Sequence, residues 1–368
     1  MELAYVGLPC QIEGLRKVAA VSRDIGQDWM EKVTLQIGLF CRENWSYSCF
    51  RALLQDDYGV DLEKVKKFDI KKGNIIAYLS NGDKVEFPLK ESKPYVRISC
   101  LVCLDFTAEL ADISVGAVGT PKKWSTVITR TKKGEELLQG AEREGYIETQ
   151  DIQEVKPGTN LIKKISKQKL DGALAEVQKR EEIGVNVPHL HSMDSEIEGL
   201  KKGEKKVFND LNYEIIDNGL CSACGICEAV CPVDAIKVVD ERPELVAKCD
   251  GYGFCYFACP RNHLPIKALK KRVLNGEVSS EEGLGEFLSI KAVRAKDEKI
   301  LNRGQDGGAV TALLAYALDK GIISGAISVK AGADPWRPEP CLSTTREELL
   351  KSSGTFYAYS TTIPAVKP

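Results

Sequence analysis

Apolar residues recur at helical spacing between residues 163 and 182, among Lys, Gln and Glu; the apolar positions are Ile165, Leu170, Ala173, Leu174 and Val177. This pattern predicts an amphipathic helix with one solvated face. The run VTLQIGLFC (33–41) predicts an apolar strand, and ALLAYAL (312–318) predicts a regular helix. The segment AIKVVDERPELVAK (235–248) alternates like two short strands around an Asp-Glu-Arg-Pro turn, which predicts a β-hairpin.

Three glycine-rich segments are expected where a strand passes into a turn or helix: GLPCQ (7–11), SVGAVGTPKKWSTVITRT (114–131) and GQDGGAVTALLAYAL (304–318). Gly307 and Gly308 precede a helix, whose free N–H groups favour an anion such as a cofactor pyrophosphate. Gly116 and Gly119 allow the backbone to approach a flat ligand. Because no segment matches a dinucleotide or P-loop fingerprint, ordinary turn geometry stays open.

Two polar segments are interpreted as structural. Residues 183–205 are polar and contain His189 and His191, which we interpret as exposed positions of an interdomain linker. The run KALKKR (267–272) predicts a charged helix face; docking of an acidic partner is the alternative.

Composition excludes several classes. A chain of 368 residues suits two or three domains. Its 51 Lys and Arg against 53 Asp and Glu give a net charge of −2, and 43% of residues are apolar, which argues against a disordered chain and a basic nucleic-acid binder. No apolar run approaches the roughly 18 residues of a membrane span, and the start lacks a signal-peptide layout, so we expect a cytoplasmic protein. Three His against 13 Cys direct attention to sulfur.

The strongest motif is CSACGICEAVCP (221–232), with the spacing C-x2-C-x2-C-x3-C-P of a bacterial ferredoxin. One tight loop must supply three thiolates while its N–H groups point at the sulfides, and small residues permit that wrap. Zinc sites use C-x2-C pairs without this continuation, so a zinc knuckle or disulfides is the weaker interpretation.

The second half of the motif, CDGYGFCYFACPR (249–261), has Tyr252 where a middle cysteine would stand. Because the fourth Cys of each half ligates the other cluster, one cluster would take Cys221, Cys224, Cys227 and Cys259, and the other Cys231, Cys249 and Cys255. The remaining corner would be Asp250, a distant Cys, or no ligand, the last giving a three-iron cluster. We place this two-cluster domain at 206–265.

A further cysteine group lies in the first third of the chain. Cys100 and Cys103 form a C-x2-C pair followed by Asp105, and Cys10 and Cys41 lie at the ends of expected strands. Such strand ends would meet at one edge of a sheet, and four thiolates there would make a third iron–sulfur site. Buried free thiols are the alternative, which we favour for Cys49 and Cys341.

These residues resemble the beta subunit family of coenzyme F420-reducing hydrogenase, which includes F420-dependent dehydrogenase input subunits and the amino-terminal part of F420-dependent sulfite reductase. The resemblance covers most of the chain outside the linker and is carried by VGLPCQIEGLRK (6–17), IGLFCREN (37–44), FDIKKGNIIAYL (68–79), SCLVCLDFTAELADISVGAVGT (99–120), WSTVITRTKKGEEL (124–137), GQDGGAVTALLAYAL (304–318) and GTFYAYST (354–361).

The resemblance implies an α/β (α+β) flavin-binding domain with a mixed sheet, plus a small bacterial-type ferredoxin domain with two 4Fe-4S clusters. The implied FAD site comprises Gly304, Gln305, Asp306, Gly307, Gly308, Ala309, Val310, Thr311, Ser114, Val115, Gly116, Val118, Gly119, Trp124, Ser125 and Thr126. A 4Fe-4S cluster is implied at Cys10, Cys41, Cys100 and Cys103, with Asp105 as an alternative ligand.

The order of segments is rotated relative to the family, in which the GQDGG segment precedes the GLPCQ segment. Placing 193–368 ahead of 1–192 restores the familiar order. A circular permutation, or two pieces of one protein joined in inverted order, would each produce this sequence. In both cases we predict that 1–182 and 285–368 are the second and first halves of one FAD/F420 domain, with 266–284 as a connector.

The implied reaction is hydride transfer from reduced F420, the substrate, to FAD, followed by single-electron transfer through the clusters to a partner subunit or domain. We therefore assign no catalytic side chain. The phosphate and acidic tail of F420 predict a basic lip, for which Lys71, Lys72, Lys122 and Lys123 are candidates. A non-catalytic ferredoxin-like adaptor, and a flavin enzyme using another reductant such as NADPH, are the alternatives.

Overall fold

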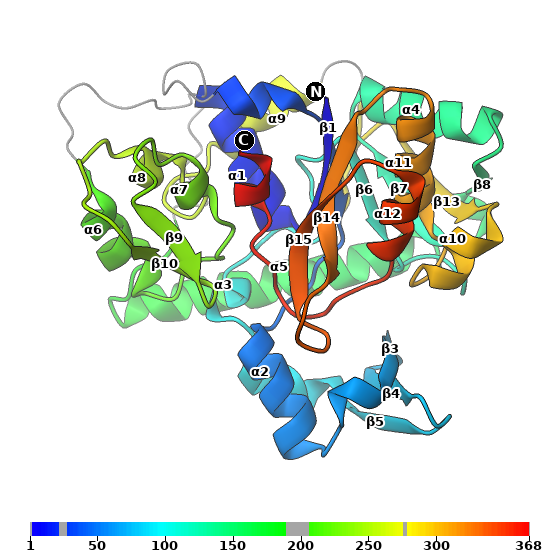
Figure 1. The fold of residues 1–368 in the computed structure, drawn as a ribbon, viewed down its shortest axis with the longest axis horizontal. Coiled ribbons are helices and arrows are strands. Elements are labelled where there is room, and N and C mark those ends of the chain that lie inside the picture. The colour runs from blue at the N-terminus through cyan, green and yellow to red at the C-terminus, as the bar shows by residue number, and fades with distance from the viewer. Residues whose placement is uncertain (1, 22–27, 189–205, 275–277, 368) are drawn as a thin grey trace.

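The centre of the computed structural model, which describes residues 2–21, 28–188, 206–274 and 278–367, is an eight-stranded mixed sheet with the order β15-β14-β1-β2-β6-β7-β13-β8 (Figure 1). Its strands are β1 (Leu3–Gly7), β2 (Val33–Leu39), β6 (Ile113–Gly116), β7 (Ser125–Thr129), β8 (Ile147–Asp151), β13 (Ser289–Ala295), β14 (Gly325–Ala331) and β15 (Pro338–Ser343). Strands β14, β1, β2 and β6 are parallel, and the remaining pairs are antiparallel. The predicted mixed α/β architecture is confirmed.

The sheet joins segments that are far apart in the sequence. Leu3 of β1 pairs with Gly325 of β14, and Ile290 of β13 pairs with Ile128 of β7. Strand β13 lies between β7 and β8, so the early and late parts of the chain alternate within one sheet.

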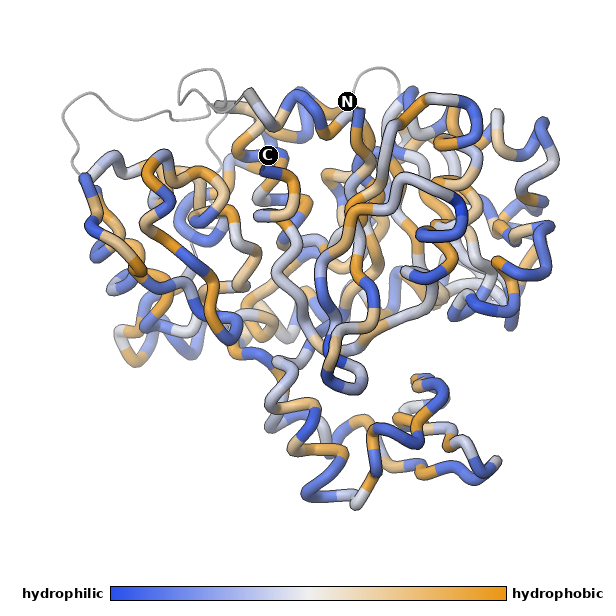
Figure 2. Tube along the Cα trace, viewed as in Figure 1, coloured by the Kyte–Doolittle hydropathy of each residue, from blue (hydrophilic) through white to orange (hydrophobic). Residues whose placement is uncertain are grey.

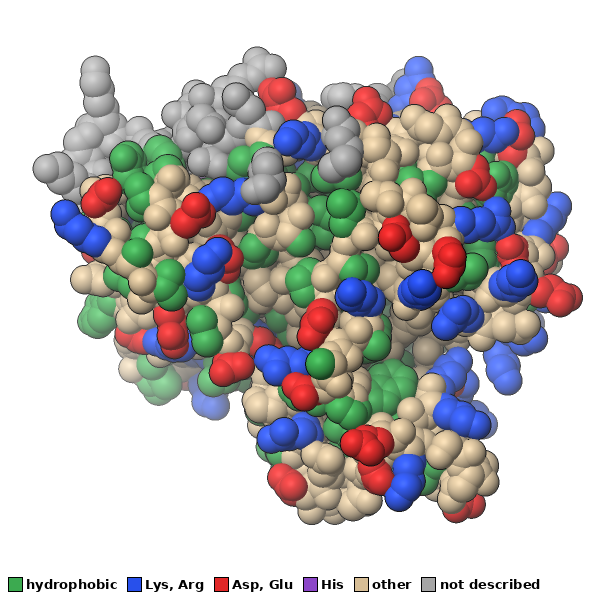
Figure 3. Space-filling view, viewed as in Figure 1, with side chains coloured by type: hydrophobic (Ala, Val, Ile, Leu, Met, Phe, Trp, Pro, Cys, Tyr) green, Lys and Arg blue, Asp and Glu red, His purple; other side chains and the backbone are tan. Residues whose placement is uncertain are grey.

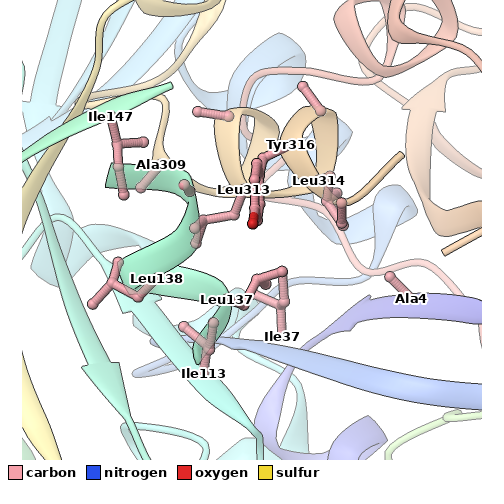
Figure 4. Packing of buried hydrophobic residues seen from close by; sticks show 14 of the residues in the cluster. Ala4, Ile37, Ile113, Leu137, Leu138, Ile147, Ala309, Leu313, Leu314 and Tyr316 are labelled. Carbon is pink, nitrogen blue, oxygen red and sulfur yellow. The ribbon is translucent and has the colours of Figure 1, made fainter. Parts of the chain in front are cut away.

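Helices cover both faces of the sheet. Side chains alternate along each strand, so successive residues of β1 pack on opposite faces. Ala4 belongs to a core shared with α4 (Lys132–Arg143) and α11 (Ala309–Asp319), where Leu137, Leu138, Leu313 and Leu314 pack (Figure 4). Leu3 and Tyr5, on the opposite face, pack with α1 (Pro9–Val21). Apolar stretches are concentrated in the strands and their covering helices (Figure 2).

The other helices are short, apart from α5. They are α2 (Tyr47–Ala52), α3 (Ile98–Leu101), α6 (Phe208–Leu211), α7 (Ile226–Ala229), α8 (Phe254–Ala258), α9 (Ile266–Val273), α10 (Glu298–Arg303) and α12 (Arg346–Lys351). The predicted amphipathic helix is α5 (Thr159–Glu182), which begins four residues earlier than expected. The basic run 267–272 lies in α9, where Lys270 pairs with Glu109 and Arg272 donates to Ala20 O, so part of that charge faces the protein.

A small lobe extends from the sheet between β2 and β6 (Figure 1). It consists of α2 and the antiparallel strands β3 (Val65–Lys71), β4 (Asn74–Leu79) and β5 (Lys84–Pro88). Trp45, Phe50 and Phe68 belong to its own apolar core. This lobe was not predicted as separate from the rest of 1–182.

The cysteine-rich segment forms a compact unit around the hairpin β9 (Ile236–Val239) and β10 (Arg242–Leu245). The hairpin turn is at Asp240 and Glu241, so the expectation that Arg242 and Pro243 belong to the turn was wrong; both pair in β10. Leu264 and Leu269, which follow the cysteines, share an apolar core with Ile12 and Leu15 of α1. The unit is thereby packed against the sheet domain.

Two other expectations need revision. The loop 304–308 follows helix α10 and not a strand. The expected connector 266–284 contains α9 and β11 (Ser279–Glu281), which pairs with β12 (Gly285–Phe287) beyond the expected boundary. Most of the expected linker, with His189 and His191, lies outside the described residues.

Arg130 should be a stability determinant of the sheet. Its buried guanidinium donates to Ser114 Oγ, Thr107 Oγ1, Leu284 O and Glu286 O at 2.7–2.9 Å. Replacing Arg130 with Leu leaves these buried acceptors without a donor. We therefore expect a loss of about 3–5 kcal/mol in unfolding free energy, measured as a lower melting temperature. Lys320→Met, which breaks the exposed ion pair with Glu144, is the control and should change little. Equal melting temperatures for both variants would contradict this role.

Candidate iron–sulfur and flavin sites

The carboxyl ends of parallel strands bring distant cysteines together. Strand β1 ends at Gly7, shortly before Cys10, and β2 ends at Leu39, two residues before Cys41. Because β1 and β2 are parallel, both thiols lie at the same sheet edge, where Cys100 and Cys103 join them. Burial, together with the neighbouring Cys103 and Cys100 and against the charge of Arg261, raises the pKa of Cys10 to about 12. Burial and the same neighbours, together with Cys10, raise the pKa of Cys41.

Two buried cations accompany this four-thiol site (Cys10, Cys41, Cys100 and Cys103). Lys169 Nζ donates to Cys41 O at 2.5 Å and to Asp105 O at 2.6 Å. Burial alone would lower the pKa of Lys169, but the thiols of Cys103, Cys41 and Cys100 raise it above its ordinary value. Burial likewise acts to lower the pKa of Arg261. Its pKa is nevertheless raised above the ordinary value, chiefly by Cys103, to which it is hydrogen-bonded.

The donor set of the four-thiol site fits an iron–sulfur cluster. Four thiols with compensating cations match a cluster held by thiolates. Arg261 Nε is buried without a partner among the described atoms, and a cluster sulfide would be a suitable acceptor. Since burial raises the pKa of Cys10, Cys41 and Cys100, binding a cluster as thiolates would release protons. Asp105 Oδ1 is also buried without a partner, which keeps its carboxylate available as a ligand.

In the compact cysteine-rich unit around β9 and β10, which we call the ferredoxin unit, two pockets are lined by cysteines. The first ferredoxin pocket is lined by Cys221, Cys224, Cys227 and Cys259, the four residues that the crossed rule assigns to one cluster. Ala223 N–H donates to Cys221 Sγ at 3.3 Å, and Ile226 N–H to Cys224. Such N–H···S bonds are typical of cluster-binding loops.

The second ferredoxin pocket is lined by Cys231, Cys249 and Cys255, together with Asp250 and Tyr252. Ala235 N–H donates to Cys231 Sγ at 3.3 Å. Burial and the neighbouring Cys249 raise the pKa of Cys255 to about 12.

All 13 cysteines are free, which excludes disulfides in this structure. Among the described residues, no three His, Cys, Asp or Glu side chains are close enough to share a single metal ion. Thiolates around a cluster are spaced more widely than around one ion, because several iron atoms lie between them. Cys49 and Cys341 line none of these sites; both are half-buried, and Cys341 Sγ lies 3.6 Å from Ser328 Oγ.

Helix α1 connects the four-thiol site to the first ferredoxin pocket. Cys10, Gly14 and Lys17 are spaced to lie on one face of the helix. A Cβ atom on Gly14 would lie 3.7 Å from Cys224 Sγ, and Lys17 Nζ donates to Cys259 O at 2.7 Å. Burial lowers the pKa of Lys17 to about 8. The two sites are therefore separated by little more than one helix.

Two of the glycine-rich segments, which we call the glycine loops, lie at the same sheet edge as Cys10 and Cys41. They are the loops 114–119 and 304–308. A Cβ on Gly307 would lie 2.5 Å from Val293 O, so only glycine fits, and Gly307 N–H donates to Ser125 Oγ at 3.2 Å. Gly308 caps α11 with a φ of 69°. The first N–H groups of α11, at Ala309, Val310 and Thr311, have no intrahelical acceptors, which suits a phosphate.

Three of the hydroxyl groups predicted to bind FAD form hydrogen bonds within the protein. Ser114 Oγ accepts from Arg130, Ser125 Oγ accepts from Gly307, and Thr126 Oγ1 donates to Val118 O at 2.7 Å. These groups join the 114–119 loop to β7 and β7 to the 304–308 loop. Trp124 and Val118 pack at the edge of a neighbouring apolar cluster, and Gly116 lies against Phe40, near Val115. Gly119 has a φ of 102°.

The lobe contributes to this region through the 304–308 loop, which begins at Gly304. Lys67 Nζ donates to Gln305 O at 3.1 Å, and Gln305 Nε2 donates to Phe68 O at 3.2 Å. Burial raises the pKa of Asp306, and Asp69 of the lobe raises it further. The lobe and the glycine loops thus share one polar boundary.

Several residues at these sites were missed from the sequence: Lys169, Arg261, Lys17 and Glu13. Burial raises the pKa of Glu13 to about 7, and Arg261 opposes that shift. Lys169 lies within a Lys-rich helix pattern that indicates a solvated face. The one available signal was the position of Arg261, directly after Cys259-Pro260.

Comparison with known proteins agrees with the motif assignment. Models of the coenzyme F420 hydrogenase/dehydrogenase beta subunit match 1–155 for its carboxyl-terminal part and 290–367 for its amino-terminal part, and a 4Fe-4S binding domain matches 214–237. The chain belongs to this beta subunit family. The rotated order of its two parts, predicted from the motifs, is confirmed.

Relatives of this family member include the coenzyme F420 hydrogenase subunit beta of Methanothermobacter thermautotrophicus, 40% identical over 51% of this chain and 66% of that protein. The coenzyme F420-dependent sulfite reductase of Methanocaldococcus jannaschii is 42% identical over 49% and 28%. The F420-reducing NiFe hydrogenase complex of Methanosarcina barkeri contains a chain that is 38% identical, with 50% and 63% coverage and a TM-score of 0.48. The chain thus spans at most about two thirds of the length of these relatives.

Among the helices of the described residues, none combines the length and the apolar character that a membrane span needs.

Lys169 should tune the four-thiol site. Its charge favours the more negative, reduced form of a bound cluster, so Lys169→Met should lower the iron content and shift the midpoint potential down by roughly tens of millivolts. Redox titration followed by electron paramagnetic resonance (EPR) measures this shift. Lys167→Met, two residues away in α5 and paired with exposed Asp171, is the matched control. An unchanged potential and iron content in Lys169→Met would refute this role.

Proposed function

We propose that the chain is an F420-dependent oxidoreductase module, which exchanges a hydride between coenzyme F420 and FAD and passes single electrons through iron–sulfur clusters to a partner subunit or domain. Relatives of the chain are named as F420-dependent hydrogenase, dehydrogenase and sulfite reductase proteins. The observation that carries the proposal is the contiguous series of thiol sites that begins at the sheet edge holding the glycine loops.

The cysteines of this series influence one another in order. Cys10 of the four-thiol site raises the pKa of Cys224 in the first ferredoxin pocket, after burial and nearer cysteines. Cys255 of the second pocket does the same for Cys227 of the first. Charges on successive sites are therefore close enough to interact. Such proximity suits electron transfer and has no evident use in a purely structural role.

Tyr359 lies between the four-thiol site and the first pocket, in one apolar cluster with Cys10 and Ala223. The Arg97 guanidinium lies over its ring at 4.4 Å, and Thr361 Oγ1 donates to Ala223 O at 2.8 Å. Cys10, Ala223 and Tyr359 are all buried, and the Thr361 hydrogen bond holds the first loop of the ferredoxin unit in place.

FAD, when bound, supplies the chemistry that converts a hydride into single electrons. The residues of this chain would orient it: the N-terminus of α11 offers N–H groups to the phosphates, and Gly307 keeps the loop closely packed on β7 and β13. Arg130, through Ser114, fixes the strand that leads into the Gly116–Gly119 loop. No side chain of the chain is required to act as an acid or base.

The coenzyme F420 would bind where the lobe faces the glycine loops. Lys67 and Lys71 lie near Asp306 there, and Lys72, Lys122 and Lys123 are exposed. Figure 3 shows Lys and Arg side chains, interspersed with Asp and Glu, on both the lobe and the body of the molecule. Lysines at the boundary between the lobe and the glycine loops would favour a phosphate and an acidic tail.

The proposal predicts a specific reductant. Anaerobic mixing of the cofactor-loaded chain with reduced F420 should bleach the flavin absorbance and then that of the clusters, whereas NADPH should bleach neither. Bleaching by NADPH alone would indicate another reductant. An electron-transfer adaptor would be indicated if neither reductant reduces the flavin while the clusters still accept electrons from an artificial donor.

Gly307 should be required for FAD binding. Gly307→Ala introduces a Cβ within 2.5–2.9 Å of Val293 O and of Ser125, so the loop must move and the flavin content should fall at least severalfold. The flavin released by denaturation, per chain, measures this. Gly172→Ala is the control, because Gly172 lies in α5 with nothing within 4 Å of the added Cβ. Full flavin content in Gly307→Ala would remove this loop from the FAD site.

A further inference from the structure

The two ferredoxin pockets differ in their thiols. Four cysteines line the first, but three line the second: Cys231, Cys249 and Cys255. In the first pocket, Cys224 is the middle ligand of the C-x2-C-x2-C loop. The matching middle position of the second loop is Tyr252.

Two residues of the second pocket carry side-chain oxygen atoms, Tyr252 and Asp250; its other lining residues are cysteine, apolar or glycine. Tyr252 is 52% exposed, and its ring lies 5.8 Å from that of Phe254. The Asp250 side chain is 46% exposed and lies 3.9 Å from the ammonium group of Lys248. Neither side chain is buried, in contrast to Cys255, so neither is held in place as a ligand by packing.

The loop around this corner turns at two glycines. Gly251 and Gly253 flank Tyr252 with φ angles of 78° and 76°, so the backbone turns on both sides of the tyrosine. Val233, which lines the same pocket as Tyr252, is also exposed. An iron atom at this corner would therefore meet solvent and oxygen donors, whereas iron in a sulfide cluster prefers thiolate.

We propose that the second ferredoxin pocket binds a three-iron cluster, 3Fe-4S, held by Cys231, Cys249 and Cys255, with the fourth corner free of iron beneath Tyr252. This inference goes beyond the proposed function, because it concerns the composition of one cluster and does not depend on F420 or FAD. The first ferredoxin pocket and the four-thiol site, each with four thiols, would retain four-iron clusters.

The test uses the full chain purified without oxygen, and compares the wild type with Tyr252→Cys and Asp250→Asn. An oxidised 3Fe-4S cluster is paramagnetic, whereas an oxidised 4Fe-4S cluster is not. We expect one paramagnetic centre per wild-type chain by EPR spin counting. In Tyr252→Cys the signal should disappear and the iron content should rise by one atom per chain, while Asp250→Asn should resemble the wild type.

Other outcomes would overturn the proposal. A silent oxidised wild type with the iron content of Tyr252→Cys means that four irons are already present. Loss of one iron in Asp250→Asn means that the carboxylate is the fourth ligand. A signal that persists in Tyr252→Cys arises from damage at another cluster. If Tyr252→Cys does not fold, the wild-type spin count and iron content still decide, and neither depends on whether F420 is the reductant.

Discussion

Positive charge buried among cysteine thiols is the interaction on which the rest of the structure depends. Thiolates are costly to bury unless a cation and hydrogen bonds compensate them. Lys169 supplies one such charge from α5, and Arg261 supplies another from the ferredoxin unit, where it directly follows Cys259-Pro260. The four-thiol site therefore takes part of its charge balance from the other unit. Separating the two units would leave buried sulfur uncompensated.

The sheet topology determines where this charge is needed. Parallel strands end at one edge, so β1 and β2 deliver Cys10 and Cys41 to the place where β6 leads into its glycine loop. Helix α1 then starts at this edge and carries Lys17 to the backbone of Cys259. The position of ligands at the carboxyl ends of strands in open α/β sheets follows from the same geometry. The thiols of Cys10 and Cys41, the glycine loop after β6 and the start of α1 thus all lie at the carboxyl edge of the parallel strands.

Sequence reasoning worked where local spacing determines structure. The ferredoxin spacing identified both sets of cysteines that the pockets later brought together, and the strand-end argument placed Cys10 beside Cys41. It failed where tertiary packing decides. Lys169 has no local feature that distinguishes it from the exposed lysines of α5, and the hydroxyl groups of Ser114, Ser125 and Thr126 could not be known to be used within the protein. The separate lobe was missed because the length and the alternation of its strands do not distinguish them from those of the central sheet.

Helix α5 meets both units of the protein from one side. Lys169 contacts the four-thiol site, and Arg180, eleven residues later, donates to Asn218 O in the ferredoxin unit at 3.2 Å. Eleven residues are close to three full turns at 3.6 residues per turn, so the two side chains share a face. Inserting or deleting one residue between them would rotate one contact by about 100° relative to the other. The length of this stretch is therefore constrained more tightly than its composition, and exposed positions within it are free to vary in evolution only if their number is kept.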